Sequence, residues 1–234
     1  PVTAPGVEQK SAWLQVRQQR PDFVLLWGWG VMNSTALKEA QATGYPREKM
    51  YGVWWAGAEP DVKGVEEGAK GYNALALNTS GQEFKIMQDI LKEVHAKGQG
   101  TGPKDEVGSV LYTRGVIIQM LSVEAVRRAQ ERFGKGKRMT GEQVRWGFEN
   151  LNVDEARLKT LGAFGMMPPV KTTCLDHEGS GAVKVQRWDG KAWKAVTPNW
   201  VVGDKAMIRK MQEESAAKYA AEKKITPRDC SKEG

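Results

Sequence analysis

Residues 21–30, PDFVLLWGWG, carry the strongest signal for the fold class. Phe23 to Trp27 is a short, continuously apolar run, which is typical of a strand buried in a parallel sheet. The segment Gly28-Trp29-Gly30 then turns the chain, Asn33 to Thr35 offers helix caps, and residues 36–43 are predicted to be helical. This order of strand, turn and helix predicts one βα unit.

The same alternation continues on both sides of this unit. Residues 8–20 are predicted to form an amphipathic helix before it, and residues 49–55 are a second strand candidate after it. A short helix over residues 65–69 and a third strand over residues 71–78 follow. Helices and strands that alternate in this way predict an α/β fold, in which helices cover a parallel sheet.

The middle of the chain is predicted to be helical. Residues 84–97 and 107–133 are amphipathic, the second stretch as one long helix or as two in succession. Residues 140–150 begin with the pattern of a capping box, Thr-Gly-Glu-Gln, which opens a further helix. Residues 153–161 are another helix candidate.

Beyond residue 168 the pattern changes to strands. Residues 182–188 and 192–196 alternate apolar and polar side chains, and Asp189-Gly190 between them is a strong β-hairpin signal. Residues 204–224 are predicted to form the last helix. Its basic residues alternate with glutamates, so it is interpreted as a solvated helix face and not as a nucleic-acid site.

The composition is that of a globular protein. The 234 residues are 40% hydrophobic and 27% charged, with a net charge of +7, which fits one large domain or two modest ones. The longest nearly apolar run, Phe23 to Met32, is too short to cross a bilayer, which takes about 20 residues. The chain opens on Pro1 without the basic and apolar regions of a signal peptide, so we expect a cleaved or trimmed product.

Few residues point to catalysis or to metal binding. Gly28-Trp29-Gly30 matches the start of a dinucleotide fingerprint, but Asn33 stands where the third glycine belongs, so the signal for a Rossmann-type enzyme is weak. His95 and His177 lie outside any nucleophile or metal motif, so we expect no cofactor and no metal. The two cysteines leave both a disulfide and two unpaired thiols open.

Tryptophan is unusually frequent, with nine residues against five phenylalanines and five tyrosines. Trp27 and Trp29 end the first predicted strand, and Trp54 and Trp55 end the second. Ligands of open α/β sheets bind in the crevice outside the carboxyl ends of the strands. Neighbouring side chains of a strand face opposite ways, so Trp54 and Trp55 cannot both be buried on one face. We therefore expect at least one of the four to face a ligand.

Several segments, taken in their order and spacing, carry a resemblance to a known family. They are residues 21–29, 36–44, 51–55, 67–72, 111–115 and 176–188. The chain resembles the branched-chain amino acid binding family of type I periplasmic solute-binding proteins, which serve ABC importers. The resemblance implies doubly wound parallel sheets with helices on both faces, in two lobes joined by a hinge. It also implies a periplasmic, non-enzymatic protein that closes around a small molecule and delivers it to an ABC permease, with no nucleic-acid partner.

The resemblance assigns each part of the chain to a lobe. Residues 1–78 correspond to an α/β segment of the second lobe, and residues 79–165 correspond to the helical part of the first lobe. Residues 166–203 return to the second lobe with the β-hairpin, and residues 204–234 are the C-terminal helix and tail. Family members are longer at the N-terminus, so we expect a C-terminal fragment that binds ligand less tightly than the longer protein.

The matched positions also supply candidate site residues. Trp29 matches the family's cleft aromatic and is expected to wall the site together with Trp54. Tyr112 and Arg114 are candidates from the first lobe. Arg114 has the chemistry to meet a ligand carboxylate, and its alternative is an exposed helix arginine.

One departure from the family concerns the ligand. Amino-acid binders of the family place an acidic residue after the second of these strands, where it pairs with the ligand ammonium, and Trp54 stands there instead. An ammonium without an anionic partner is costly to bury, so we expect a small carboxylate, preferably aromatic, in place of leucine or valine. Glu59, further along the loop, is the alternative source of charge. A sensor domain of the same fold and a Rossmann-type enzyme are the alternative functions.

The resemblance bears on the two cysteines as well. Proteins of this family are exported, and an oxidising compartment lets thiols pair. Cys174 lies in a loop-like stretch, and Cys230 follows the last predicted helix. A disulfide between them is therefore predicted, and it would pin the C-terminal tail.

Overall fold

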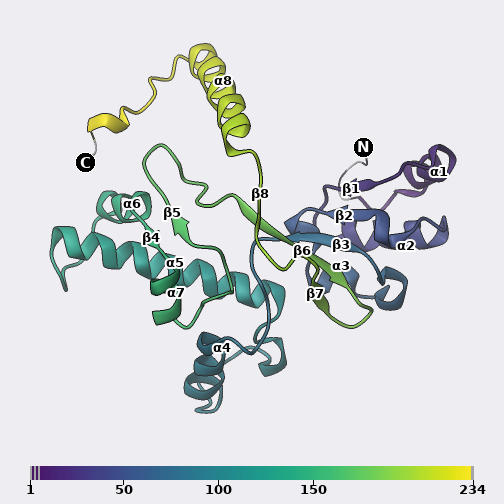
Figure 1. Ribbon diagram of the computed structural model, residues 1–234, viewed down its shortest axis with the longest axis horizontal. Coiled ribbons are helices and arrows are strands. Elements are labelled where there is room, and N and C mark those ends of the chain that lie inside the picture. Colours follow the sequence, from purple (N-terminus) through teal and green to yellow (C-terminus); the bar gives the residue numbers. More distant parts are fainter. Residues whose placement is uncertain (1, 3, 5, 233–234) are drawn as a thin grey trace. The chain divides into compact units, whose positions relative to one another are not determined.

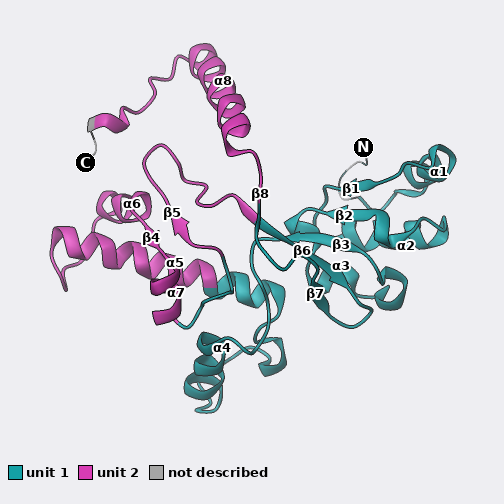
Figure 2. Ribbon diagram, viewed as in Figure 1, with its two compact units in different colours: residues 1–116, 162–167, 183–201 teal, residues 117–161, 168–182, 202–234 magenta. Residues whose placement is uncertain are grey.

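The computed structural model describes residues 2, 4 and 6–232, in which helices and strands alternate along the chain (Figure 1). These residues divide into two units, coloured teal and magenta in Figure 2. Unit 1 consists of residues 1–116, 162–167 and 183–201, and unit 2 consists of residues 117–161, 168–182 and 202–234. Each unit therefore combines segments that are far apart in the sequence.

Most of the predicted elements are present, with bounds that differ by a few residues. The helices are α1 Lys10–Gln19, α2 Val31–Ala42, α3 Glu59–Val62, α4 Lys85–Ile90, α5 Val110–Phe133, α6 Gly141–Glu149, α7 Glu155–Thr160 and α8 Lys205–Lys223. The strands are β1 Val24–Leu26, β2 Met50–Gly52, β3 Asn73–Ala76, β4 Asn152–Val153, β5 Val170–Lys171, β6 Ala182–Trp188, β7 Trp193–Ala195 and β8 Val201–Val202.

Unit 1 is built around a mixed sheet with the strand order β1-β2-β3-β6-β7, and β8 pairs with β6. β1, β2 and β3 run parallel, which confirms the predicted α/β class. β6 lies antiparallel to β3 and forms a hairpin with β7. The hairpin turn at Asp189-Gly190 is confirmed as well, since the amide of Asp189 donates to the carbonyl of Ala192 at 3.1 Å.

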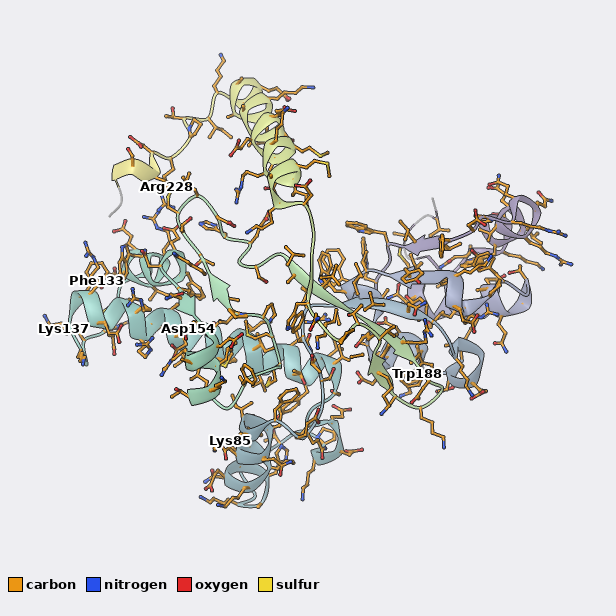
Figure 3. All side chains as sticks on the ribbon, in the orientation of Figure 1. Lys85, Phe133, Lys137, Asp154, Trp188 and Arg228 are labelled. Atoms are coloured by element: carbon orange, nitrogen blue, oxygen red, sulfur yellow. A yellow bond between two sulfur atoms is a disulfide. The ribbon has the colours of Figure 1, made fainter. Side chains whose placement is uncertain are left out.

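The core of unit 1 joins this sheet to its helices. Trp13 of α1, Leu37 of α2, Met50 of β2 and Trp188 of β6 are all buried in one apolar cluster, and Figure 3 labels Trp188. Burial of each large apolar side chain contributes about 1.5–3 kcal/mol to stability. The amphipathic patterns of the sequence thus correspond to helix faces that pack on the sheet.

The first predicted strand is not buried, and this corrects the sequence analysis. β1 is the edge of the sheet, and Phe23, Leu25 and Trp27 all point to one exposed face of it. Leu25 keeps 82% of its surface exposed. Only the alternate side chains, Val24 and Leu26, pack against the core. The apolar run Phe23 to Trp27 therefore forms a strand that unit 1 covers on one face only.

The second predicted strand is shorter than expected, and the predicted caps of α2 are wrong. β2 ends at Gly52, and Trp54–Ala56 form a 3-10 turn in which the amide of Ala56 donates to Val53 O at 2.8 Å. Trp54 and Trp55 therefore do not alternate across a strand. α2 begins at Val31, so Asn33 lies inside the helix and is fully buried. Its side chain serves the site described below.

Unit 2 contains the later part of α5 together with α6, α7 and α8. α5 is one continuous helix, so the single-helix alternative is the correct one. The capping box is confirmed, because Thr140 and Gln143 each accept a hydrogen bond from the amide of the other, at 3.3 and 2.9 Å. The two-residue strands β4 and β5 pair with each other. They are not predicted, because two residues are too few to show a periodicity.

The C-terminal tail is attached to unit 2 by covalent and ionic bonds. Cys174 and Cys230 form the predicted disulfide, with Cα atoms 5.8 Å apart. Arg228, labelled in Figure 3, donates two hydrogen bonds of 2.6 Å to the carboxylate of Glu149. Both interactions join segments that are far apart in the sequence, so they fix the tail against the body of unit 2.

Candidate ligand-binding site

The four tryptophans predicted for the site lie together in unit 1, because the parallel strands β1 and β2 end at the same edge of the sheet. The ring centroids of Trp54 and Trp55 are 4.7 Å apart. Trp27 lies 6.4 Å from Trp54, and Trp29 lies 6.0 Å from Trp55, both edge to face. Trp27, Trp29 and Trp55 keep 69%, 54% and 44% of their surface exposed. We call these four residues the tryptophan cluster.

The turn that carries Trp54 and Trp55 is held by its backbone. Each of the four carbonyls from Trp54 to Gly57 accepts a hydrogen bond from a side chain of a different part of unit 1. The bonds are Arg114 Nη2 to Trp54 O (3.1 Å), Asn33 Nδ2 to Trp55 O (2.8 Å), Tyr72 OH to Ala56 O (2.8 Å) and Gln186 Nε2 to Gly57 O (2.6 Å). Buried carbonyls outside a sheet ladder need such partners, so these donors fix the position of the turn.

Two glycines allow this close packing. A Cβ atom at Gly52 would clash with the hydroxyl of Tyr72, and one at Gly57 would come within 2.6 Å of Ala74 Cβ. Real Cβ atoms do not approach other atoms so closely in native packing. Glycine at both positions therefore lets the turn rest directly on the sheet, where Tyr72 and Gln186 reach it.

Two acidic residues lie beside the turn, and both are already bonded within the chain. The buried carboxylate of Asp61 accepts from Asn33 Nδ2 at 2.7 Å and from the amide of Ala58 at 2.8 Å. Burial raises the pKa of Asp61 above its usual value. Glu59 accepts from the amide of Val110 at 3.2 Å with both oxygens. Val110 begins α5, and the positive end of a helix favours a carboxylate there.

The two predicted residues of α5 differ in their surroundings. Arg114 lies beside the turn and donates to Trp54 O, so it is not an exposed helix arginine. Burial lowers the pKa of Arg114, and the carboxylates of Asp61 and Glu59 act against this. Its Nε atom has no hydrogen-bond partner among the described residues. Tyr112 is half-buried, and no contact found in the described part of the chain joins its ring to the tryptophan cluster.

The sequence analysis missed the residues that position the turn. Asn33 was assigned to a helix cap, and Asp61, Tyr72 and Gln186 were not singled out. Their signal is that polar side chains stand on otherwise apolar buried faces, since all four are at least nine-tenths buried. Polar groups of that kind are nearly always hydrogen-bonded, but the sequence does not say to what.

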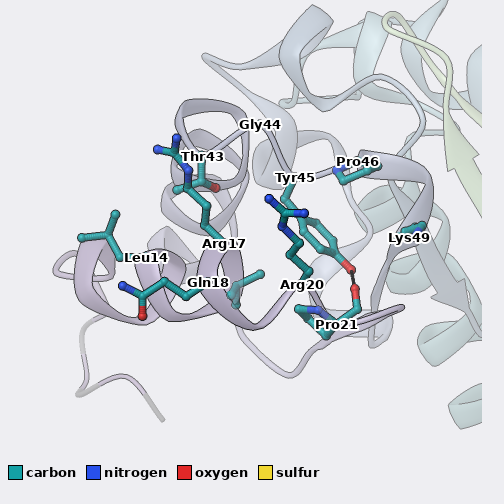
Figure 4. Close-up of a pocket in the computed structure, with 11 residues that line it drawn as sticks. Leu14, Arg17, Gln18, Arg20, Pro21, Thr43, Gly44, Tyr45, Pro46 and Lys49 are labelled. Atoms are coloured by element: carbon teal, nitrogen blue, oxygen red, sulfur yellow. Dashed lines mark hydrogen bonds between the residues drawn. The ribbon is translucent and has the colours of Figure 1, made fainter.

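A cavity of about 910 Å³ lies beside Tyr45, between the ends of α1 and α2 (Figure 4). The hydroxyl of Tyr45 donates to Pro21 O at 2.9 Å, and Arg17, Arg20 and Lys49 line the walls. Both helices present their C-terminal ends here, and helix dipoles stabilise positive charge at such ends. This placement accounts for Arg17 and Arg20 at the end of α1, so the positive charge at the cavity does not by itself indicate an anion site.

A second cavity, of about 670 Å³, lies in unit 2 and has mainly apolar walls, including Leu121 and Phe148. His177 lies at this cavity, with Nε2 3.4 Å from the carboxylate of Glu149. The same carboxylate is bonded by Arg228. His177 and Arg228 thus both pair with Glu149 at this cavity.

Comparison with known families identifies the fold. Residues 1–192 match the family described as periplasmic binding protein. The chain belongs to this family. The match covers well over half of the chain and includes the tryptophan cluster and all four side chains that hold the turn. Membership in a binding-protein family is consistent with a site made of aromatic rings and structural hydrogen bonds.

Solved structures support the same assignment. The periplasmic binding protein described here is 41% identical to a protein of the Pseudomonas fluorescens group described as an ABC transporter permease, with a TM-score of 0.91 over 98% of this chain and 55% of that one. A Thermus thermophilus branched-chain amino acid ABC transporter with bound valine is 21% identical, with a TM-score of 0.67 over 89% and 52% of the two chains. An R. palustris solute-binding protein in complex with benzoate is 16% identical, with a TM-score of 0.56 over 87% and 50%.

The chain spans about half the length of these structures. No curated protein matched it. In the part of the chain that the structure describes, no helix has the length and apolar character to cross a membrane. The same part holds no group of three or more histidine, cysteine or acidic side chains placed to bind a metal ion.

Proposed function

We propose that this periplasmic binding protein captures a small carboxylate, preferably an aromatic one, for an ABC importer, and that it does so in the periplasm by closure about a hinge. The observation that carries the proposal is the tryptophan cluster, in which the exposed rings of Trp27 and Trp55 contact the half-buried Trp54 and the exposed Trp29 contacts Trp55. Stacking of an aromatic ligand on such rings contributes about 0.5–1.5 kcal/mol beyond area burial. An ABC permease is the expected partner.

The electrostatics of the turn support a ligand without an ammonium group. Glu59, the alternative partner for an ammonium, uses both carboxylate oxygens on the amide of Val110. Asp61 is bonded to Asn33 and Ala58. Arg114 is the positive group beside Trp54, and it lies near both carboxylates. A charge-assisted hydrogen bond to a carboxylate is worth about 1.5–3 kcal/mol.

A thermal-shift panel tests the ligand class. Ligand at 100 times its dissociation constant adds about 2.7 kcal/mol of stability, which raises the melting temperature by about 5–10 °C at this size. We expect benzoate-like acids to give this shift and leucine to give none. The variant Trp54→Glu supplies an acid and is expected to reverse the order, whereas Trp200→Glu is the matched control. A shift with leucine that Glu59→Gln abolishes would refute the proposal.

The length of the chain leads to a second expectation. Because the solved relatives are about twice as long, we propose that a protein of full family length adds polar contacts from its own first lobe. Calorimetry with one aromatic acid is expected to show weaker binding by the 234-residue chain than by the longer protein. Equal affinities would mean that the chain holds the complete site.

A further inference from the structure

A small cavity lies on one face of the sheet in unit 1, next to the turn that carries the tryptophan cluster. Its volume is about 40 Å³, and Asn78, Thr79, Lys184, Gln186 and Trp193 contribute polar groups to its lining. None of its lining residues belongs to the tryptophan cluster. Several polar atoms of the residues that line it have no hydrogen-bond partner among the described residues.

The strand register explains why these residues meet. Ala76 of β3 lies opposite Lys184 of β6, and Gln186 lies opposite both Ala74 of β3 and Ala195 of β7. Residues opposite each other in an antiparallel pair share one face, as do alternate residues of one strand. The small side chains of Ala76 and Ala195 line the cavity and leave space between the longer ones.

Three of the residues that line this space carry buried polar atoms without partners. Asn78 is only 2% exposed, and neither its Oδ1 nor its Nδ2 has a hydrogen-bond partner among the described residues. The same holds for Thr79 Oγ1 and Trp193 Nε1, which are also buried. Buried polar groups in native proteins nearly always have partners, from the protein or from ordered water. Four such atoms around one cavity therefore indicate a bound molecule.

We propose that this cavity is a binding site for ordered water, which bridges Asn78 at the end of β3 to Trp193 of β7. Trp193 Nε1 needs an acceptor and Asn78 Oδ1 needs a donor. Water meets both needs, whereas an anion donates nothing to Asn78 and a metal cation accepts nothing from Trp193. A cavity needs a volume of about 10–15 Å³ to hold one water molecule, and the cavity of about 40 Å³ exceeds this, so at least one molecule fits.

The bound water completes the sheet face on which the Trp54–Gly57 turn rests. Gln186 lines the cavity and also donates to Gly57 O at 2.6 Å. The water therefore stabilises the same layer of side chains that positions the tryptophan cluster. Its binding does not depend on any ligand, so the inference stands independently of the proposed transport function.

Water–protein NMR on the full chain tests the proposal. Nuclear Overhauser and rotating-frame cross peaks of opposite sign between the Trp193 indole proton and water indicate a long-lived water molecule, and Trp193→Phe assigns the indole signal. We expect such peaks for Trp193, and only weak peaks for the exposed Trp29. A Trp193 indole proton without these peaks would overturn the proposal.

Two variants separate water from other occupants. Asn78→Leu and the nearly isosteric Thr79→Val each remove a partner of the water, and the second serves if the first does not fold. We expect at least one of them to abolish the Trp193 peak, while Asn199→Leu, an exposed control, leaves it unchanged. A peak that persists in both variants would overturn the proposal. So would a Trp193 indole shift that follows the chloride concentration, because it would mean that Lys184 holds an anion there.

Discussion

The substitution Tyr72→Phe tests whether side-chain donors hold the turn of the tryptophan cluster. Tyr72 is fully buried, and its hydroxyl donates to Ala56 O at 2.8 Å. Burial raises the pKa of Tyr72 further above its usual value, so the hydroxyl stays a donor at any ordinary pH. Phenylalanine keeps the ring and its packing and removes only the hydroxyl. The carbonyl of the buried Ala56 then has no side-chain partner.

The expected loss of stability in Tyr72→Phe follows from the lost hydrogen bond to Ala56 O. Leaving a buried acceptor unsatisfied costs about 1–3 kcal/mol. Because the other three carbonyls of the turn keep their donors, the cost falls mainly on local opening of residues 53–57. At 1.4 kcal/mol per factor of ten, the turn should open about 5- to 140-fold more often. The rest of unit 1 should keep its stability to within the same 1–3 kcal/mol.

Hydrogen exchange of the Ala56 amide measures this opening, because that amide donates to Val53 O within the turn. Tyr45→Phe is the control, since it also removes a tyrosine hydroxyl that donates to a carbonyl, that of Pro21, at 2.9 Å. We expect faster exchange at Ala56 only in Tyr72→Phe. Unchanged exchange in that variant, or equal acceleration in both, would refute the view that the carbonyl donors position the turn.

Three further predictions concern stability. Replacing Cys174 and Cys230 by serine should lower the free energy of unfolding by about 4 kcal/mol, because the bridge closes a loop with a sequence separation of 56 residues. Urea titration measures this loss, and two free thiols in the unreduced, denatured protein would show that the disulfide does not form. Burial opposes ionisation of Glu124, but hydrogen bonds from two arginines, including Arg157 at 2.5 and 2.8 Å, lower its pKa overall. Glu124→Gln should therefore cost about 2 kcal/mol near pH 7, less than the removal of one partner from a fully buried pair. Because the pKa of Glu124 is lowered in the folded state, this cost should shrink as the pH drops below the usual glutamate pKa of about 4.3 and through the lower folded-state pKa; a pH-independent difference would contradict it. Leu25→Lys should change the free energy of unfolding by less than about 0.5 kcal/mol, because the Leu25 side chain lies exposed on an edge strand; a larger loss in urea titration would contradict this.

Much of the fold could be predicted because its signals are local. Most helices and strands of unit 1 leave a local pattern, although α3 and the two-residue β8 do not, and the capping box and the hairpin turn are short motifs with one structural meaning. The exposure of β1 could not be predicted in the same way. An apolar run such as Phe23 to Trp27 shows that a strand is apolar on both faces, but which elements cover those faces is a property of the whole chain.

The site was predictable in its aromatic part and not in its polar part. Trp27 and Trp54 follow neighbouring parallel strands, so topology alone brings them together. The donors to the turn come from distant positions, and Gln186 is 129 residues from Gly57. No spacing rule links such a pair, because the bond depends on how the hairpin joins the sheet. The sequence analysis also predicted a strand over residues 49–55. Carbonyls of a strand bond within the sheet, so this prediction gave no reason to expect side-chain donors to the carbonyls of Trp54 and Trp55.

The division between exposed rings and buried donors has a consequence for binding. Ordering a flexible side chain or loop at an interface costs about 0.5–1.5 kcal/mol for each group that is immobilised. In this protein the backbone of Trp54 and Trp55 is fixed by Arg114 and Asn33 before any ligand arrives, so that cost is met within the fold. Substitutions of the exposed rings should then alter which ligand binds while stability changes little. Substitutions of the buried donors should weaken every ligand, because they release the turn on which all of the proposed contacts depend.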